Sequence, residues 1–514
     1  MRNGLFRGGY SKPKDPEERF SAGRQVPFYA VALLVFSFLF GMVHSQYDLN
    51  SNISFYLPSF GREALLLLLN FLCIKPCIFG FHKVHGNATK WKVALEDDLQ
   101  ANRHTRLEFS SNPRFLVSSR ESKLGPTGLP ANVIMAICLA VTYAAGQMVF
   151  LELKYPDQQS GEIVHNTLLS HFALQVLGTV ILIQAGLSAW ALWSVDIKTW
   201  NQSPFATAYI LLSDKEKKPL KKVPGRCMHS LYYHLRETEP TKPEKHSAWD
   251  SHKIFRDLTI WIWMLIGGGF YWAALIFFMV QSGTPGSYRG SNWNPTSTPS
   301  NSTWSNGSPA FNLGWEGKAP IFGLLWGLGI LIGFQGGIVT TAMTCAQTLL
   351  DLECDNKMWM EIEDKEKGLD PDPHMFKQFK LSYNSYLIHI ADPLFHWLFG
   401  LGVNVSADDG LQVRPVPIIY ICVIGVIGAS YITLLLKREP KNSIPATFGH
   451  LQTMVDLVDV WEEKMFWGDK SSAGQSLRHA GTSEDKCRVR SVEDFSSEGY
   501  IYGGEDCPGC RLRL

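Results

Sequence analysis

The sequence predicts an all-α fold, a polytopic bundle of about eight transmembrane helices with both termini in the cytosol. Charged residues make up 18 % of the chain and hydrophobic residues 46 %, whereas soluble domains carry about 25 % charged residues. The apolar residues gather in stretches of roughly 20, the length that crosses a bilayer as a helix. Lys and Arg concentrate in every second connecting segment, as in cytosolic loops. A lipid bilayer is the expected partner, and a net charge of +1 gives no reason to expect nucleic acid.

Eight apolar stretches define the expected helices. They cover residues 26–43, 64–81, 129–151, 168–194, 258–280, 321–350, 386–403 and 416–436. We interpret the first as a signal anchor, because it is longer than the apolar region of a secretory signal. The alternative is cleavage by a signal peptidase, which Val43-His44-Ser45 would suit. The second contains Lys75 and the seventh contains Asp392 and Pro393, so either could be a re-entrant or interfacial hairpin.

A chain that starts in the cytosol and crosses eight times has a simple domain organisation. It has a basic tail (1–25), a transmembrane bundle (26–436) with cytosolic loops (82–128, 195–257 and 351–385), and a cytosolic tail (437–514). Most Lys and Arg residues fall in these cytosolic parts. If the second or the seventh stretch did not span, a basic loop or tail would lie outside, so we expect both to span.

Glycosylation sequons are compatible with this topology. The outer loop 281–320 is rich in polar residues and contains Asn301-Ser-Thr and Asn306-Gly-Ser. Asn52-Ile-Ser and Asn404-Val-Ser also fall in expected outer loops. The sequence thus indicates a glycoprotein, located in a secretory-pathway membrane or in the plasma membrane.

The cytosolic tail is expected to hold one amphipathic helix, residues 448–466, and a disordered end. Apolar residues from Leu451 to Met465 recur at helical spacing, and acidic residues occupy the other side. The acidic side disfavours anionic lipid, so the helix could dock on the basic loop 215–222. The alternative is a helix that only packs against its neighbours. Cys507-Pro-Gly-Cys has redox or zinc spacing, but no second such pair accompanies it.

Part of this tail resembles a known group of proteins. His450-Leu-Gln-Thr-Met-Val-Asp-Leu-Val-Asp, then Met465-Phe-Trp-Gly-Asp-Lys and His479-Ala-Gly-Thr-Ser, are similar to the tail of uncharacterised multi-pass membrane proteins of fungi. The resemblance is short. It implies a fungal integral membrane protein and brings no activity, cofactor or site residue.

Polar side chains within the expected helices are the candidates for function, because such groups are costly at membrane depth. They are Gln147, His171, Gln175, Gln184, Gln335, His389, Asp392 and His396. In an unbroken helix, His389, Asp392 and His396 share a face and could bind a metal ion or relay protons. Alternatively, Asp392-Pro393 starts a helix with Asp392 as N-cap, and His389 then leaves that face. Lys75 is expected to extend toward the lipid head groups.

Small residues recur on the sixth predicted helix. Gly329, Gly333 and Gly337 are spaced by four, which lets another helix approach closely. The partner helix could belong to the same bundle or to another subunit of a homo- or hetero-oligomer.

The sequence lacks the common catalytic motifs. We find no phosphate-binding loop, zinc-protease motif or nucleophile elbow, so we assign no catalytic residue, metal or cofactor and disfavour an enzyme. Passage of a small solute, by a transporter or channel, ranks first because of the polar set. The alternatives are a non-catalytic sensor or scaffold acting through the tail, and a membrane-embedded enzyme or metal protein using His389, Asp392 and His396.

Overall fold

The structure is a computed structural model that describes most of the chain between residues 54 and 503. The described residues are 54–55, 57, 59–96, 118–156, 163–198, 203–213, 220, 222, 227–228, 242–297, 307–314, 320–364, 366, 368–369, 383–406, 410–462, 464–472, 477–492 and 500–503. The expected first helix, the Cys507 motif and the sequons at Asn52, Asn301 and Asn306 lie outside these residues, as does most of the basic loop 215–222.

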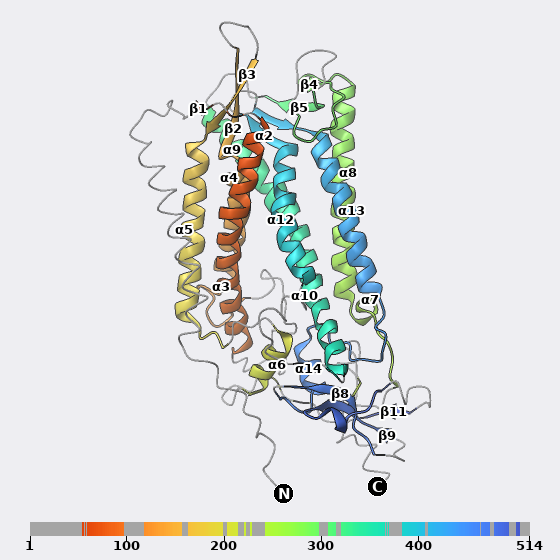
Figure 1. Cartoon of the computed structure of the whole chain (residues 1–514). Helices are drawn as coiled ribbons and strands as arrows, with labels where there is room; N and C mark the ends of the chain where they lie inside the picture. The colour runs from red at the N-terminus through yellow and green to blue at the C-terminus, as the bar shows by residue number, and fades with distance from the viewer. Residues whose placement is uncertain are drawn as a thin grey trace.

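Within the described residues, seven long helical segments lie side by side and alternate in direction (Figure 1). They are α2–η1–α3 (Ser59–Leu69, Asn70–Ile74, Lys75–Ala94), α4 (Leu129–Gln147), α5 (His171–Ser194), α8 (Lys253–Gln281), α9–η4–α10 (Pro320–Leu331, Ile332–Val339, Thr340–Glu363), α12 (Tyr383–Gly402) and α13 (Pro415–Lys437). All except α12 satisfy the length and hydropathy expected of a membrane span. The predicted bundle of long helices is thereby confirmed, and six of its described segments are long and apolar enough to cross a membrane.

Helix α12 continues through Pro393. The helix runs over Tyr383–Gly402 with this proline inside it, so the interpretation of Asp392 as an N-cap is wrong. A proline inside a helix removes one backbone hydrogen bond, a loss that contacts with neighbouring helices can offset. His389, Asp392 and His396 therefore lie on one continuous helix.

A seven-stranded sheet covers one end of the bundle, although the sequence predicted an all-α fold. Its strands are β1 (Ser54–Phe55), β2 (Phe150–Pro156), β3 (Ile163–Leu169), β4 (Ser287–Tyr288), β5 (Ala310–Leu313), β6 (Val403–Ser406) and β7 (Gly410–Val413), in the order β1-β3-β2-β6-β7-β5-β4. They come from all four segments predicted to lie outside. Short strands that pair across long sequence separations leave little local signal. The sequon residue Asn404 lies in β6, half-buried and opposite Gln412.

A buried ionic cluster lies beneath the sheet. Arg62 contacts Glu63 at 2.6 Å and Glu152 at 3.3 Å, and Arg414 lies 3.7 Å from Glu152. The Arg414 side chain also donates a 2.8 Å hydrogen bond to Gln412. Two arginines and two glutamates balance in charge, as buried ions require. The cluster joins α2, β2 and the residue before α13, and so ties the sheet to the helices.

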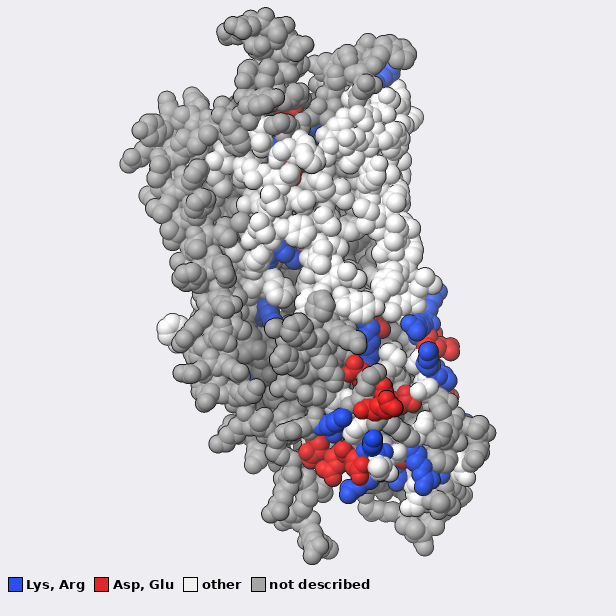
Figure 2. Space-filling model, in the orientation of Figure 1, with Lys and Arg blue, Asp and Glu red and all other residues white. Residues whose placement is uncertain are grey.

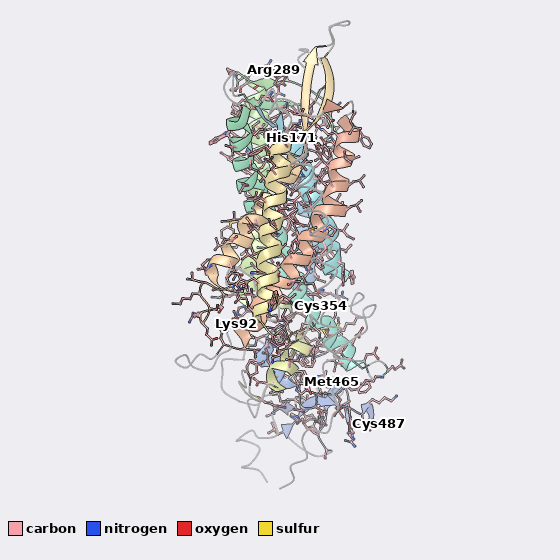
Figure 3. The ribbon with its side chains drawn as sticks, turned by 90° about the vertical axis from the view of Figure 1, so that its left-hand side faces the viewer. Lys92, His171, Arg289, Cys354, Met465 and Cys487 are labelled. Carbon is pink, nitrogen blue, oxygen red and sulfur yellow. The ribbon has the colours of Figure 1, made fainter. Side chains whose placement is uncertain are left out.

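The opposite end carries a small domain in which charged side chains are dense, whereas the visible face of the bundle is mainly uncharged (Figure 2). Figure 3 marks the two ends, with Arg289 beside the sheet and with Met465 and Cys487 in the small domain. The domain comprises α6 (Pro204–Ser213), α14 (Leu451–Leu457), β8 (Phe466–Asp469), β9 (Leu477–Arg478), β10 (Ala480–Ser483), η5 (Lys486–Arg488) and β11 (Ile501–Tyr502). β8 pairs with β10, and β9 pairs with β11. We call it the tail domain. The short helix α7 (Ala248–Ser251) packs instead against α8 and α13 of the bundle.

The tail helix is much shorter than predicted. Helix α14 spans Leu451–Leu457, not residues 448–466. The Thr482 hydroxyl accepts hydrogen bonds from the backbone N–H groups of Asp459 and Val460, at 3.1 and 3.0 Å. A continued helix would use these N–H groups internally. The prediction of a disordered end is also wrong for the described residues beyond it, which include β8 to β11.

Candidate intramembrane polar site

Four helical segments bring polar side chains together inside the bundle. These side chains are Lys75 from α3, Tyr143 and Gln147 from α4, Gln335 from η4, and Asp392 and His396 from α12. Two of the segments involve π-helix: Lys75 directly follows η1, and Gln335 lies within η4. The wider π turn changes the direction of side chains along a helix and is frequent at functional sites.

Asp392 is the centre of the site. Its carboxylate forms an ion pair with the Lys75 ammonium group through Oδ2. The Tyr143 hydroxyl donates to the same oxygen at 2.8 Å, and His396 Nε2 lies 3.4 Å from Oδ1. Asp392 is only 7 % exposed. A buried carboxylate is stable only with such partners, so these contacts hold the negative charge in the bundle.

His396 is held on both its ring and its backbone. The ring, fully buried, stacks on Tyr143 with centroids 3.6 Å apart and planes at 7°. The backbone carbonyl oxygen accepts hydrogen bonds from Gln147 Nε2 at 3.1 Å and Gln335 Nε2 at 3.2 Å. A carbonyl oxygen has two lone pairs, so it can accept both. The two glutamines thus fix this turn of α12 from two sides.

The Gln147 side chain fits against a glycine of α12. A Cβ atom added at Gly400 would lie 2.1 Å from Gln147 Oε1. Only glycine leaves room for this amide. The glycine at position 400 therefore allows the Gln147 side chain of α4 to pack closely against α12 at the site.

Half of the predicted polar residues meet at this site. Gln147, Gln335, Asp392 and His396 belong to it. The other four lie elsewhere. Gln184 donates to Thr142 Oγ1 at 2.8 Å between α5 and α4, and Gln175 is exposed. His171 begins α5 near the sheet (Figure 3). His389 packs edge-on against Phe79, with ring centroids 5.0 Å apart.

Two residues of the site were not anticipated. Lys75 pairs with Asp392, so its expected extension toward the head groups is wrong. Tyr143 was not identified, because it lies in an apolar stretch and no pattern of neighbouring polar residues drew attention to it. A buried tyrosine hydroxyl usually needs a hydrogen-bond partner, which is the one signal that could have linked it to the site.

The geometry gives no support for a metal centre on α12. Among the residues that the structure describes, no group of three His, Cys, Asp and Glu side chains could hold a metal ion. His389 turns toward Phe79 on α3, while His396 stacks on Tyr143. The alternative in which His389, Asp392 and His396 share a metal therefore does not fit.

The predicted glycine stripe does not pack within the described part of the bundle. A Cβ atom added at Gly329, Gly333 or Gly337 would meet no atom within 4 Å. The close contact is made by Gly336, where an added Cβ would lie 2.1 Å from Cβ of Ala140. Gly336 thus allows α4 to approach η4 and positions Gln335 beside it.

No protein family, curated protein or solved structure matches the chain.

Proposed function

We propose that the chain is a multi-pass membrane protein that passes a small solute across the bilayer, with Asp392 as the charged group that binds the solute or a coupled ion. The observation that carries this proposal is the convergence of Lys75, Tyr143, His396 and Asp392 inside an apolar bundle. Ionisable groups at such depth are costly and commonly lie on ion or substrate pathways.

The chemistry of the site suits reversible binding. A cation or a proton can replace Lys75 as the partner of Asp392, because the carboxylate then keeps a neutralising group. The His396 imidazole offers a further position for a proton within reach of the carboxylate, and the Tyr143 hydroxyl donates to that carboxylate. Gln147 and Gln335 contribute by positioning, since both bind the backbone of His396.

The topology belongs to the same proposal. We infer eight crossings, with residues 26–43 as the first, and a tail domain in the cytosol, because described Lys and Arg side chains gather at that end (Figure 2). The sheet then faces the lumen or the exterior, in a secretory-pathway membrane or the plasma membrane. Glycans at Asn301 and Asn306 and a subunit contact along the exposed Gly329 stripe also fit, as does membership of the fungal family.

The proposal is testable with purified protein in liposomes on a solid-supported membrane. Charge displacement is recorded while a panel of amino acids, sugars, organic acids and inorganic ions is applied at several pH values. We expect at least one solute or proton gradient to give a current that Asp392→Asn abolishes. Gln175→Ala is the matched control, because Gln175 is a polar residue of the bundle outside the site. Absence of any current, or full current in Asp392→Asn, would refute the proposal.

A sensor or scaffold is the second candidate, favoured by the folded tail domain. Its fully buried Leu451 and Met454 share one hydrophobic cluster with Trp359 of α10, and a packed domain of this kind gives a stable surface for a partner. In this case Asp392→Asn would leave recovery of cross-linked partners unchanged. Loss of the partners in that variant would count against the scaffold.

A further inference from the structure

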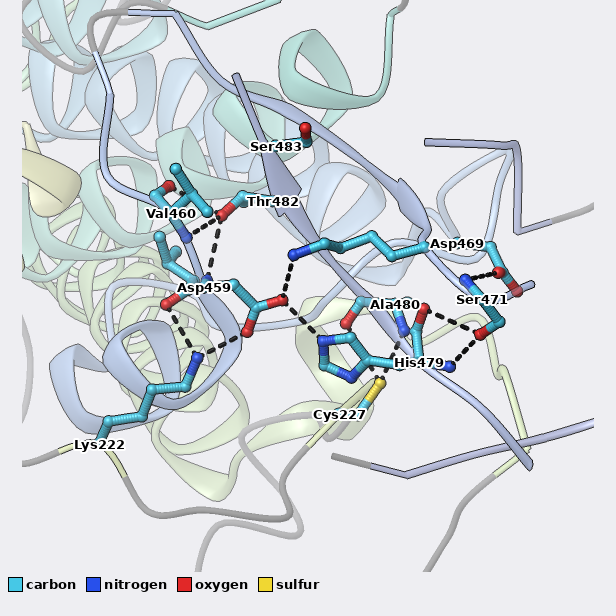
Figure 4. Close-up of polar contacts among 12 residues, drawn as sticks. Lys222, Cys227, Asp459, Val460, Asp469, Ser471, His479, Ala480, Thr482 and Ser483 are labelled. Carbon is cyan, nitrogen blue, oxygen red and sulfur yellow. Dashed lines mark hydrogen bonds and ion pairs between the residues drawn. The ribbon is translucent and has the colours of Figure 1, made fainter. Parts of the chain in front are cut away.

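Three cationic side chains surround one carboxylate in the tail domain (Figure 4). Lys222 donates to Asp459 Oδ1 at 2.6 Å, and Lys470 donates to Asp459 Oδ2 at 3.1 Å. His479 Nε2 lies 2.7 Å from the same Oδ2. The four residues come from the loop after α6, the segment after α14, the position directly after β8 and the turn between β9 and β10. We call them the Asp459 cluster.

The Asp459 cluster carries an excess of positive charge. Burial opposes the charge of His479, but the hydrogen bond to Asp459 and the neighbouring Cys227 outweigh it and raise the pKa of His479 to about 10. Burial also opposes the charge of Asp459, yet His479, Lys222 and Lys470 hold the pKa of this carboxyl well below its ordinary value. Among the described residues, the positive charges of Lys222, Lys470 and His479 thus exceed the negative charge of the Asp459 carboxylate.

A second acid of the tail domain, Asp469, does not offset this excess. The Asp469 carboxylate is already paired with Arg478, whose Nη2 lies 3.1 Å from Oδ1. It also accepts a hydrogen bond from the Tyr502 hydroxyl at 2.7 Å. Partly buried charge without a counterion is unfavourable. A bound anion would remove the imbalance.

The two lysines have donors left for such an anion. An ammonium group has three N–H donors. Lys470 uses one on Asp459, while Lys222 uses one on Asp459 and one on the Val458 carbonyl. With respect to the residues that the structure describes, three donors remain, one on Lys222 and two on Lys470, whose side chains are 39 % and 23 % exposed. His479 contributes charge only, because its second nitrogen, Nδ1, lies 3.2 Å from the Gly503 carbonyl oxygen.

We propose that the Asp459 cluster binds a phosphate monoester dianion through Lys222 and Lys470. The negative charge of a phosphate monoester opposes the positive excess of the cluster, and its three free oxygens match the remaining donors of Lys222 and Lys470. The phosphate can belong to a lipid head group or to a soluble phosphorylated molecule, since both present the same chemistry. This site is independent of the intramembrane site.

The test uses full-length protein in phosphatidylcholine nanodiscs and inorganic phosphate as the probe, titrated by thermophoresis. Removing two charge-assisted contacts should weaken binding at least about tenfold, so we expect that loss in Lys222→Gln/Lys470→Gln. Lys464→Gln is the matched control, because Lys464 lies in the same domain over the Phe466 ring, outside the cluster. Lys470→Arg should keep the affinity, and Asp459→Asn, which removes the competing carboxylate, should raise it. Melting curves verify that each variant is folded.

Nanodiscs containing phosphatidylinositol monophosphate distinguish the two sources. If the head group fills the site, the response to inorganic phosphate disappears in these discs and returns in phosphatidylcholine. If the response persists in both, the ligand is soluble. Either result supports the proposal. No response of the wild-type protein in phosphatidylcholine discs, or equal affinity in the folded double variant, would overturn it.

Discussion

The Lys75 ammonium group pairs with Asp392 inside the bundle across 317 positions of sequence. The pair joins α3 to α12, two helices whose charged residues each made the span doubtful from the sequence alone. Each charge is tolerated because the other is present. The two doubtful stretches are therefore stabilised as helices by one shared contact.

Loss of Lys75 should destabilise the protein strongly. Lys75→Met leaves the Asp392 carboxylate buried without its cation, which costs about 3 to 5 kcal/mol. We expect a large fall in unfolding free energy, measured by denaturant titration in detergent. Lys92→Met is the control, because Lys92 forms an exposed pair with Glu121 and exposed pairs contribute little. Equal stability of the Lys75 and Lys92 variants would contradict this contact.

Substitution of two nearby glycines should have opposite outcomes. Gly336→Leu places side-chain atoms where Ala140 already lies, and overpacking costs about 1 to 3 kcal/mol. Gly333→Leu points into open space and should leave the melting temperature nearly unchanged. Both are measured by thermal unfolding of the purified variants. A larger loss in Gly333→Leu would mean that the stripe, rather than Gly336, is packed.

Removal of one arginine beneath the sheet should be partly reversible by a second change. Arg414, 1 % exposed, balances the charge of Glu152, so Arg414→Met should cost about 3 kcal/mol or more. Adding Glu152→Gln restores neutrality, and we expect the double variant to recover part of the stability. A double-mutant cycle in denaturant gives the coupling energy. Strictly additive losses would argue against an interaction between the two residues.

The tail domain should lose stability at alkaline pH. The pKa of His479 rises from its ordinary value of 6.5 to about 10 in the folded state. When folding raises the pKa of a group, its protonation stabilises the folded state. This contribution is complete at pH values below the pKa in the unfolded state, and it is lost as the pH rises through the pKa in the folded state. Stability should therefore decline between about pH 6.5 and pH 10, as measured by hydrogen exchange of β8 and β10. His479→Gln should flatten this decline. An unchanged profile in that variant would assign the pH dependence to another group.

The helices were predictable because their signal is local. A stretch of about 20 apolar residues is enough to predict a helix that spans a bilayer, whatever the rest of the chain does. Seven of the eight expected stretches fall on described helical segments. The strands were not predictable, because β2 and β6 are paired although they lie far apart in sequence. The early end of the tail helix was not predictable for the same reason, because the hydroxyl that binds the Asp459 N–H group belongs to Thr482, which lies far along the sequence.

The site was predictable only as a set of residue types. Polarity within an apolar stretch identified Asp392 and His396, but it could not say which helices would meet. At Asp392-Pro393 the local sequence favours the start of a helix, with Asp392 as N-cap. In the structure the helix continues through Pro393, because packing against neighbouring helices outweighs that local preference. The spacing by four predicted that the glycine stripe packs against another helix, yet the close contact between η4 and α4 is formed by Gly336 and Ala140. Partner choice is a property of the whole fold.

The seven-stranded sheet has a mechanical consequence. Every described long helical segment is adjacent in sequence to one of its strands, so their ends on that side form one hydrogen-bonded plate. Tilting one helix there would break several backbone hydrogen bonds at once. Relative displacement of the helices is easier toward the tail domain, where no such plate joins the described segments. Rearrangements during a working cycle should therefore pivot about the sheet.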